Sequence, residues 1–456
     1  MLSAWDTLRR WLRSLPRHRH LPLILLGVVA ALSIGARVFH LDIPSEDHPG
    51  QGFVFDEKYY VNAARVIAGA PMNTTDTYAA ASPGGTDPNG EHPQLGKVLI
   101  AASIKVFGDN PIGWRMTAVI FGTAALLLLY WVVRCLGGSR WLALGATAIA
   151  AADNLWLVHG RIAVLDIYCV PFMLAGLGFY LKRRPVVAGV LIGVGMCVKE
   201  FALYAVFAIL LLEALRGLRF LLQRTDAETL DLKRLIRPAA MTATAVVSFV
   251  VLLAVLDVAV PPYHDGHTVT AHQSSLCDSL PVVGNACNHI AFMNSYAANL
   301  RSANGPQGIA SYPWQFWGNV EPIDYYTVRS TVTVGKTVTA VNTVLAFRGE
   351  IQPVVLVTAW LGILLALYRA ARRRDDMDLF VIAWIIATWL PAELASFFGQ
   401  RTTYIYYMVV TMPALYVACA RLLSSRRIPH WLLGLWVGVL LAGFAVLYPF
   451  RTLTGT

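Results

Sequence analysis

The sequence predicts an all-α polytopic membrane protein, and three observations support this class. Hydrophobic residues make up 56% of the 456 positions, and only 14% are charged, against about 25% in soluble domains. Apolar stretches of the length that crosses a bilayer recur along the chain. The basic residues stand in short clusters between these stretches, as topology signals do, so the net charge of +10 does not indicate nucleic-acid binding.

We expect about eleven transmembrane helices in a single domain over residues 1–450. The first span follows a basic segment and lacks an obvious small-residue cleavage site, so we expect a retained helix and not a cleaved signal. Alternation of the basic clusters places the N-terminus in the cytoplasm and two long loops, 42–110 and 261–350, outside. The expected spans are residues 21–41, 111–133, 141–158, 162–181, 185–198, 201–220, 238–260, 351–371, 377–397, 403–422 and 430–450.

The apolar run 185–215 is interrupted near its middle by Lys199–Glu200. One helix over this run would be about 46 Å long, well beyond the ~30 Å of hydrocarbon in a bilayer. Two passages solve this problem, and the first is then short, so Lys199–Glu200 lie below the outer surface. Charges at that depth either satisfy each other or face a cavity, here one with a buried phosphate.

The two external loops carry few elements that the sequence defines. Residues 73–90 are rich in Gly, Pro and small polar residues, which predicts a flexible loop. Residues 95–108 have apolar positions at helical spacing but include two lysines, which predicts an amphipathic helix in the outer interface. Two of the six cysteines, Cys277 and Cys287, stand ten positions apart in the second loop, where either a disulfide or free thiols fit.

A pair of adjacent carboxylates, Asp56–Glu57, follows the first span. Transfer of a group to a hydroxyl needs a base near the acceptor oxygen, for which an ionised carboxylate is suited, and a departing phosphate needs cations. Asp56 is the candidate base. Taken alone, however, an Asp before a helical run is commonly an N-cap, and a Glu in the first turn is favoured by the helix dipole.

Four further motifs place polar or aromatic groups at the outer face. Each has an ordinary explanation: a solvated histidine, a snorkelling lysine, an anchoring ion pair, or an interfacial aromatic belt. The residues of interest are His92 and Lys97 in EHPQLGK, Arg161 and Asp166 in HGRIAVLDIY, Trp314 in SYPWQFWGN, and Arg401 in GQRTTYIYYMVVTMP.

Taken together, these runs resemble the protein O-mannosyltransferase family of polyprenyl-phosphate-sugar-dependent glycosyltransferases, which have the GT-C membrane fold. FDEKYY resembles the family's DE motif, EHPQLGK its HPPLGK motif, and GRIAVLDIY its GRxxxLD run. GWRMTAVIFGT is similar to the start of its second span, GVGMCVKEFALY to its VK run, and RTTYIYYMVVTMP to its arginine–aromatic–proline run. The pieces occur in family order and cover most of residues 20–425.

The resemblance implies that Asp56 is the catalytic base and that Glu57 is a second acidic catalytic residue that orients groups. It makes Arg401, followed by Lys199, the candidate for binding the carrier phosphate, and Trp314 a candidate for stacking on a sugar. The family inverts the anomeric centre, which fits a single displacement. The remaining residues implied to surround the substrate cavity are His92, Lys97, Arg161 and Asp166.

The chain departs from the family pattern at three places. Gln94 replaces the second proline of HPPLGK, and Glu200 follows the VK lysine where an aromatic residue is usual. The second external loop is too short for the β-trefoil repeat domain of the eukaryotic enzymes, which indicates a prokaryotic type. This departure also leaves the identity of the acceptor open.

The resemblance implies a membrane enzyme that moves a sugar, most plausibly mannose, from a polyprenyl-phosphate carrier to Ser or Thr of exported proteins at the outer face of a bacterial cell membrane. A lipid or cell-wall polysaccharide acceptor is an alternative, and a lipid-carrier flippase is a rival of another class. No cofactor is expected. A divalent metal held by Asp56, Glu57 and His92 stays open, because a base role needs none.

Overall fold

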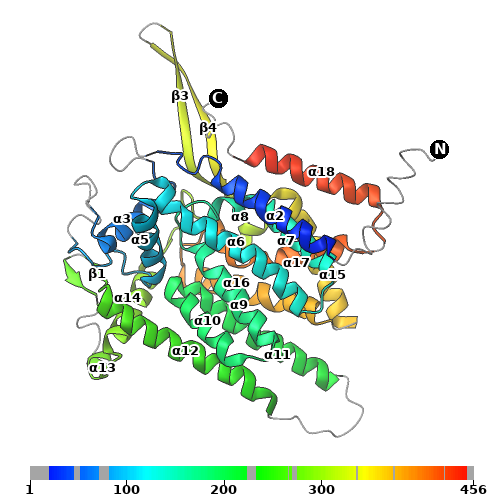
Figure 1. The fold of residues 1–456 in the computed structure, drawn as a ribbon, viewed down its shortest axis with the longest axis horizontal. Helices are drawn as coiled ribbons and strands as arrows, with labels where there is room; N and C mark the ends of the chain where they lie inside the picture. Colours follow the sequence, from blue (N-terminus) through cyan, green and yellow to red (C-terminus); the bar gives the residue numbers. More distant parts are fainter. Residues whose placement is uncertain are drawn as a thin grey trace.

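The computed structural model describes residues 20–45, 52–70, 82–222, 233–264, 266–269, 275–334, 337–372, 375–425 and 427–448. These residues form a bundle of long helices with shorter elements gathered at one end (Figure 1). The apolar helices of the bundle are α2 (Leu21–Val38), α6 (Pro111–Cys135), α7 (Arg140–Ala151), α9 (Asp166–Leu181), α10 (Pro185–Val198), α11 (Leu203–Leu222), α12 (Lys233–Ala259), α15 (Pro353–Arg372), α16 (Asp376–Gly399), α17 (Met412–Leu423) and α18 (His430–Leu447).

Each expected span overlaps one of these helices. Among the described residues, seven helices are long and apolar enough to cross a membrane, while α7, α9, α10 and α17 are shorter apolar helices. The chain is therefore an integral, multi-pass membrane protein, and the number of eleven crossings stays a prediction. Local signals set the helix starts: the side chains of Asn110, Ser139 and Asp375 accept N-cap hydrogen bonds at the starts of α6, α7 and α16.

Helix α10 is short, glycine-rich and packed against α12. A Cβ on Gly193 would lie 2.6 Å from the carbonyl oxygen of Ala245, so only glycine allows this approach. The helix ends at Val198, Lys199 is extended, and the 3-10 turn η2 (Glu200–Ala202) leads into α11. The predicted break at Lys199–Glu200 is confirmed, and it places both side chains inside the protein.

The elements of the two loops gather at one end of the bundle (Figure 1). The expected amphipathic helix is α5, which exposes Val106 yet buries Lys97 completely. Of the loop expected at 73–90, residues 73–81 lie outside the described residues, and Asp87 and Asn89 are buried. The loop elements are α3 (Glu57–Ala68), α5 (Leu95–Phe107), β1 (Tyr263–His264), β2 (His267–Thr268), α13 (Ser275–Asp278), α14 (Gly284–Asn299) and η3 (Pro313–Gly318).

The second loop also contains a β-hairpin, so the all-α expectation is too strict. Strands β3 (Ile323–Val334) and β4 (Thr337–Gly349) pair antiparallel and project well beyond the helices (Figure 1). The alternating Val and Thr residues of TVTVGKTVTAV are typical of strands, and a search for long apolar stretches passes over them. In the same loop Cys277 and Cys287 form a disulfide, which settles the choice left open by the sequence.

Candidate active site

Asp56 lies where the first loop enters helix α3. Phe55 has a positive φ of 57°, and α3 starts at Glu57. Asp56 occupies the N-cap position, but its side chain makes no capping hydrogen bond. Instead it lines a cavity of about 520 Å³, with walls from α3, residues 89–92, η2, α14 and residues 401–407. The structure therefore does not support the simple N-cap explanation for Asp56.

Burial in this cavity raises the pKa of the Asp56 carboxyl to about 6. The positive charge of Lys199 acts in the opposite direction, and the negative charge of Asp166 adds to the rise. An acid with this pKa is ionised at neutral pH but holds a proton more readily than an exposed aspartate does. Such a group is well matched to general-base catalysis.

Besides the exposed Lys58 of α3, two cations reach the same cavity from distant parts of the chain. Lys199 lines it, with its Nζ 2.6 Å from Asp166 Oδ1 and 4.8 Å from the ring centroid of Phe201. Arg401 lines it from the segment after α16, and its guanidinium donates to the carbonyl of Ala297. The predicted convergence of Asp56, Lys199 and Arg401 is thus present in the structure.

His92 and Glu200 form a further polar pair at the cavity wall. His92 Nδ1 lies 2.9 Å from Glu200 Oε1, and both residues line the cavity. Glu200 is the residue that departs from the family pattern after the VK lysine. The structure gives this departure a partner, because the Glu200 carboxylate fixes the imidazole of His92 beside Asp56's cavity.

Glu57 faces the protein interior and does not line the cavity. One carboxylate oxygen lies 2.9 Å from Arg115 Nε and the other 2.9 Å from Arg115 Nη2. The main-chain N–H groups of Val54 and Ala163 donate to the same carboxylate at 2.8 Å each. Glu57 therefore positions the loop that carries Asp56, and nothing in its geometry brings it to a substrate.

Four other predicted substrate-binding residues also lie away from the cavity lining: Lys97, Arg161, Asp166 and Trp314. Asp166 is buried and reaches the cavity only through Lys199, whose Nζ lies 2.6 Å from its Oδ1. Lys97 is buried, with its Nζ 2.5 Å from Asp87 Oδ2. Arg161 is buried and donates to the carbonyls of Phe39 and His40, both at 3.1 Å. Trp314 is 56% exposed and stacks on Tyr312. Motif membership alone did not distinguish these internal or surface contacts from cavity contacts.

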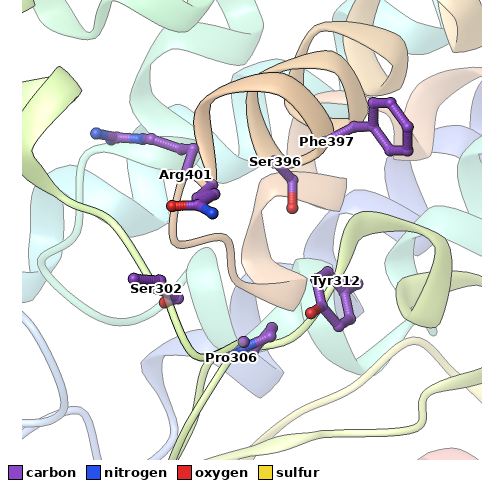
Figure 2. A pocket seen from close by; sticks show the side chains of 9 residues that line it. Ser302, Pro306, Tyr312, Ser396, Phe397 and Arg401 are labelled. Carbon is purple, nitrogen blue, oxygen red and sulfur yellow. The ribbon is translucent and has the colours of Figure 1, made fainter.

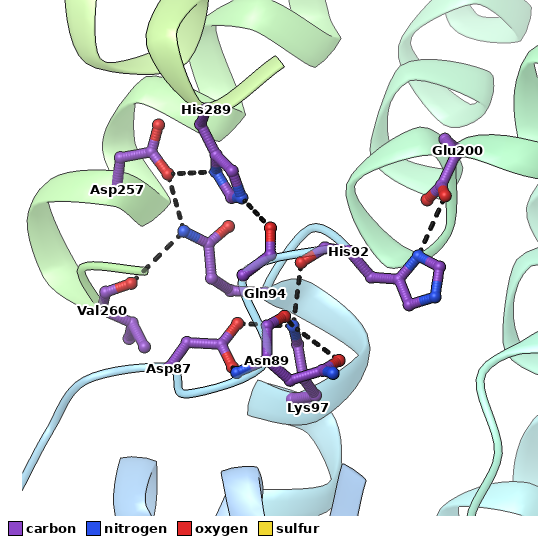
Figure 3. Close-up of polar contacts among 10 residues, drawn as sticks. Asp87, Asn89, His92, Gln94, Lys97, Glu200, Asp257, Val260 and His289 are labelled. Atoms are coloured by element: carbon purple, nitrogen blue, oxygen red, sulfur yellow. Dashed lines mark hydrogen bonds and ion pairs between the residues drawn. The ribbon is translucent and has the colours of Figure 1, made fainter. Parts of the chain in front are cut away.

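A buried hydrogen-bond network that the sequence analysis missed holds the loop from which Asn89 and His92 enter the cavity (Figure 3). Asp257 Oδ1 accepts from Gln94 Nε2 at 2.7 Å and lies 2.7 Å from His289 Nδ1. His289 Nε2 lies 2.8 Å from the carbonyl oxygen of Gly90. Gln94, the replacement for the family's proline, thus has a specific partner. A lone carboxylate in the apolar run of α12 was the available signal.

Lys97 stabilises the same loop from its other side. Its ammonium group donates to the main-chain carbonyls of Asn89 and His92, the latter at 2.8 Å, besides pairing with Asp87 (Figure 3). Asn89 and His92 both line the cavity. Lys97 and the Asp257 network therefore fix the backbone on which two cavity residues stand.

The residues suggested for a divalent metal do not converge. Within the described ranges, no group of three or more His, Cys, Asp and Glu side chains is arranged to hold a metal ion. Glu57 is engaged by Arg115, and His92 is turned to Glu200. Asp56 is the one of these three carboxylate and imidazole candidates that faces the cavity without such a partner among the described residues, and the geometry offers it as a base.

The sequence is similar to those of known mannosyltransferases. The family model described as dolichyl-phosphate-mannose-protein mannosyltransferase matches residues 28–260, just over half of the chain. A polyprenol-phosphate-mannose–protein mannosyltransferase of Mycolicibacterium smegmatis is 24% identical over 94% of this chain and 89% of that protein. One of the same name from Corynebacterium glutamicum is 37% identical, over only 27% of this chain and 23% of its own.

The fold is similar to that of a solved yeast enzyme. The structure of the Saccharomyces cerevisiae protein O-mannosyltransferase Pmt1–Pmt2 complex bound to the sugar donor superposes with a TM-score of 0.64. The alignment covers 98% of this chain and 91% of that chain at 11% identity, so it supports the fold alone. With the family match over residues 28–260, these findings show that the chain belongs to the dolichyl-phosphate-mannose-protein mannosyltransferase family.

Proposed function

We propose that this protein transfers mannose from a polyprenyl-phosphate carrier to the hydroxyl of Ser or Thr in exported proteins. The names of the mycobacterial and corynebacterial relatives support this donor and this class of acceptor. The observation that carries the proposal is the single cavity in which the Asp56 carboxylate, Lys199 and Arg401 meet. A base and two cations are what transfer from a phosphate to a hydroxyl requires.

The reaction is a single displacement. The acceptor oxygen attacks C1 of mannose while Asp56 accepts its proton, and the bond between C1 and the phosphate oxygen breaks. The departing carrier phosphate takes the electron pair of that bond, and Lys199 and Arg401 stabilise its charge. Attack opposite the leaving group inverts the anomeric centre, so a β-linked donor gives an α-mannoside without a covalent sugar–enzyme intermediate.

The proposal includes a membrane arrangement. The basic clusters favour a cytoplasmic N-terminus, eleven crossings and an active cavity that opens to the outside of a bacterial cell membrane. The elements that line the cavity belong to the two loops expected outside and to the adjoining helix ends. The donor's lipid tail then enters between helices, and the acceptor polypeptide approaches from the aqueous side.

The substitution Asp56→Asn tests the mechanism in membranes supplied with labelled carrier-linked mannose. Loss of the base is expected to lower the transfer rate by about 10²–10⁴-fold. The matched control is Asp324→Asn, which makes the same charge change at an exposed residue outside the cavity lining. Wild-type transfer by the Asp56 variant would remove this residue from the mechanism.

Thermal unfolding separates a catalytic effect from a folding defect. Because burial raises the pKa of Asp56, its ionised form is less favourable in the folded state than in the unfolded chain above about pH 6. Asp56→Asn is therefore expected to unfold at no lower temperature than wild type at pH 8.

Product analysis identifies the acceptor. Label recovered in the organic extract instead of in protein would indicate a lipid acceptor.

A further inference from the structure

A second cavity of about 250 Å³ adjoins the one that holds Asp56. It is lined by residues of the 302–306 segment, by Tyr312 and by the end of α16 (Figure 2). Arg401 lines both cavities, so they are neighbours. The proposed mechanism uses no residue of the second cavity other than Arg401.

The chain builds this cavity by pairing two distant segments. Residues 300–302 run antiparallel to residues 400–402: Ser302 N donates to the Gln400 carbonyl at 2.8 Å, and Thr402 N donates to the Leu300 carbonyl at 2.9 Å. Ser311 N then donates to the Thr403 carbonyl at 2.9 Å. The intervening loop 303–310 thus starts and ends on one strand-like segment, with Gly305 and Gly308 at the positive φ values its turns require.

The same loop forms a wall between the two cavities. Leu300 and Ile309 line the Asp56 cavity, whereas Ala303 and Pro306 line the second one. The Arg401 side chain turns away from the second cavity (Figure 2) and donates to Ala297, a residue of the Asp56 cavity. The two spaces therefore meet at Arg401, and a polypeptide in extended conformation, at ~3.3 Å per residue, can reach from one to the other within a few residues.

The lining chemistry favours a polypeptide as the occupant. Tyr312, Phe397 and Pro306 offer apolar surfaces, and Ser396 directs its hydroxyl into the space (Figure 2). A phosphate-bearing lipid head would need cations, but the only charged residue of the lining is Arg401, whose guanidinium points elsewhere. A neutral mixture of aromatic and hydroxyl groups suits a small uncharged side chain and its peptide groups.

We propose that this second cavity is a subsite for the acceptor polypeptide. It takes a small uncharged side chain within a few residues of the Ser or Thr whose hydroxyl meets Asp56. This inference rests on the proposed function, because it presumes an acceptor polypeptide that enters the Asp56 cavity. The second cavity thereby contributes to the selectivity for acceptor sequences, in addition to the Asp56 cavity.

Photo-crosslinking tests the subsite without requiring mannosyl transfer. The probes are neutral peptides with one Thr and a diazirine analogue of leucine placed, in separate peptides, two, three or four residues away, each incubated with the protein in membranes. Crosslinks are expected within residues 302–312 or 396–401. Ser396→Leu fills the cavity and is expected to abolish them, as is Ala303→Leu, which adds bulk at an exposed lining residue and guards against a folding defect.

Kinetics supply a matched comparison. Phe397 and Phe398 are adjacent and 76% and 78% exposed, but only Phe397 lines the cavity. Phe397→Ala is expected to raise KM for the peptide at least about tenfold, or ~1.4 kcal/mol, with kcat nearly unchanged, whereas Phe398→Ala leaves both constants unchanged.

The outcomes separate the two proposals. Crosslinks elsewhere, crosslinks that persist in both filled variants, or equal effects of the two Phe substitutions would overturn the subsite. Crosslinks at the subsite without mannosyl transfer by wild type would uphold the subsite and refute the proposed transfer reaction.

Discussion

Asp56 and Glu57 are neighbours in the chain, yet their carboxylates have different surroundings. Because α3 starts between them, the side chain of Asp56 enters the cavity and that of Glu57 enters the interior beside Arg115. The pairing of the two acids in the sequence therefore does not reflect a shared chemical task. In the proposed reaction Asp56 accepts the proton, whereas Glu57 fixes the backbone around it.

The pH dependence of transfer follows from the Asp56 pKa of about 6. The base must be ionised, so kcat/KM is expected to level off above pH 6 and to fall about tenfold per pH unit below it. The measurement is a pH profile of transfer at low donor concentration in sealed membrane vesicles. An inflection near 4, the value of an exposed aspartate, would contradict the buried setting.

Glu57→Gln is expected to reduce stability and leave this pH profile in place. The amide cannot neutralise the buried charge of Arg115, and breaking such a pair costs about 3–5 kcal/mol. The thermal unfolding temperature should drop well below that of wild type, while folded protein keeps its inflection near pH 6. A variant of full stability that has lost the inflection would instead make Glu57 the base.

The sequence motifs identified some of the residues that line the cavity, but not all of the motif residues point into it. Asp56, His92, Lys199 and Arg401 were predicted and line it. Residues such as Arg161 lie within motifs too, but their direction depends on how helices pack, which no local run of letters contains. The same limit hid Asp257 and His289, whose contacts join α12 and α14 to the first loop.

At the scale of elements, the loop of residues 89–92 is held in place by contacts with α12 and α14. His289 on α14 connects Asp257 on α12 with the main chain at Gly90, and the neighbouring residues Asn89, Glu91 and His92 line the cavity. The two ring nitrogens of His289 lie 2.7 Å from Asp257 Oδ1 and 2.8 Å from the Gly90 carbonyl oxygen, so the ring joins α12 to the first loop. The position of His92 is thereby tied to the packing of α14 on α12.

The substitution His289→Phe keeps an aromatic ring in place but removes both ring nitrogens and their contacts with Asp257 and Gly90. Asp257 is then left buried with the Gln94 amide as its hydrogen-bond donor, and the expected loss of stability is about 3–5 kcal/mol. KM for the donor should also rise, because the 89–92 backbone loses an anchor. Thermal unfolding and donor kinetics measure these effects, and combining the change with Asp257→Leu is expected to restore part of the stability. Unchanged unfolding of the single variant would show that the network is dispensable.

The hairpin shows why element types were harder to predict than helix positions. Long apolar runs identified every helix of the bundle, since the bilayer imposes a length and a composition on each. No comparable constraint acts on β3 and β4, which alternate Val and Thr in the aqueous loop. The base of the hairpin nevertheless contacts the cavity wall. The ring centroid of Tyr325 lies 4.6 Å from the ring centroid of Phe55, the residue before Asp56.

For the whole molecule, the topology prediction can be tested with single cysteines in a Cys135→Ala background. Asn304 lies in the loop expected outside and Ser424 in a loop expected inside, and both are exposed. A membrane-impermeant maleimide should label Asn304→Cys in intact cells and Ser424→Cys only after permeabilisation. The reverse pattern would place the Asp56 cavity on the cytoplasmic side.

Helix α10 ends early, and the membrane gives this a chemical meaning. Its 14 residues rise only about 21 Å, against ~30 Å of hydrocarbon, so in the proposed membrane arrangement the floor of the cavity at Lys199 would sit beneath the headgroup layer. Mannose on a carrier bound at that depth would be kept away from bulk water, which competes with the acceptor hydroxyl as a nucleophile. Depth would then protect the donor from wasteful hydrolysis, and a low yield of free mannose during turnover would be its sign.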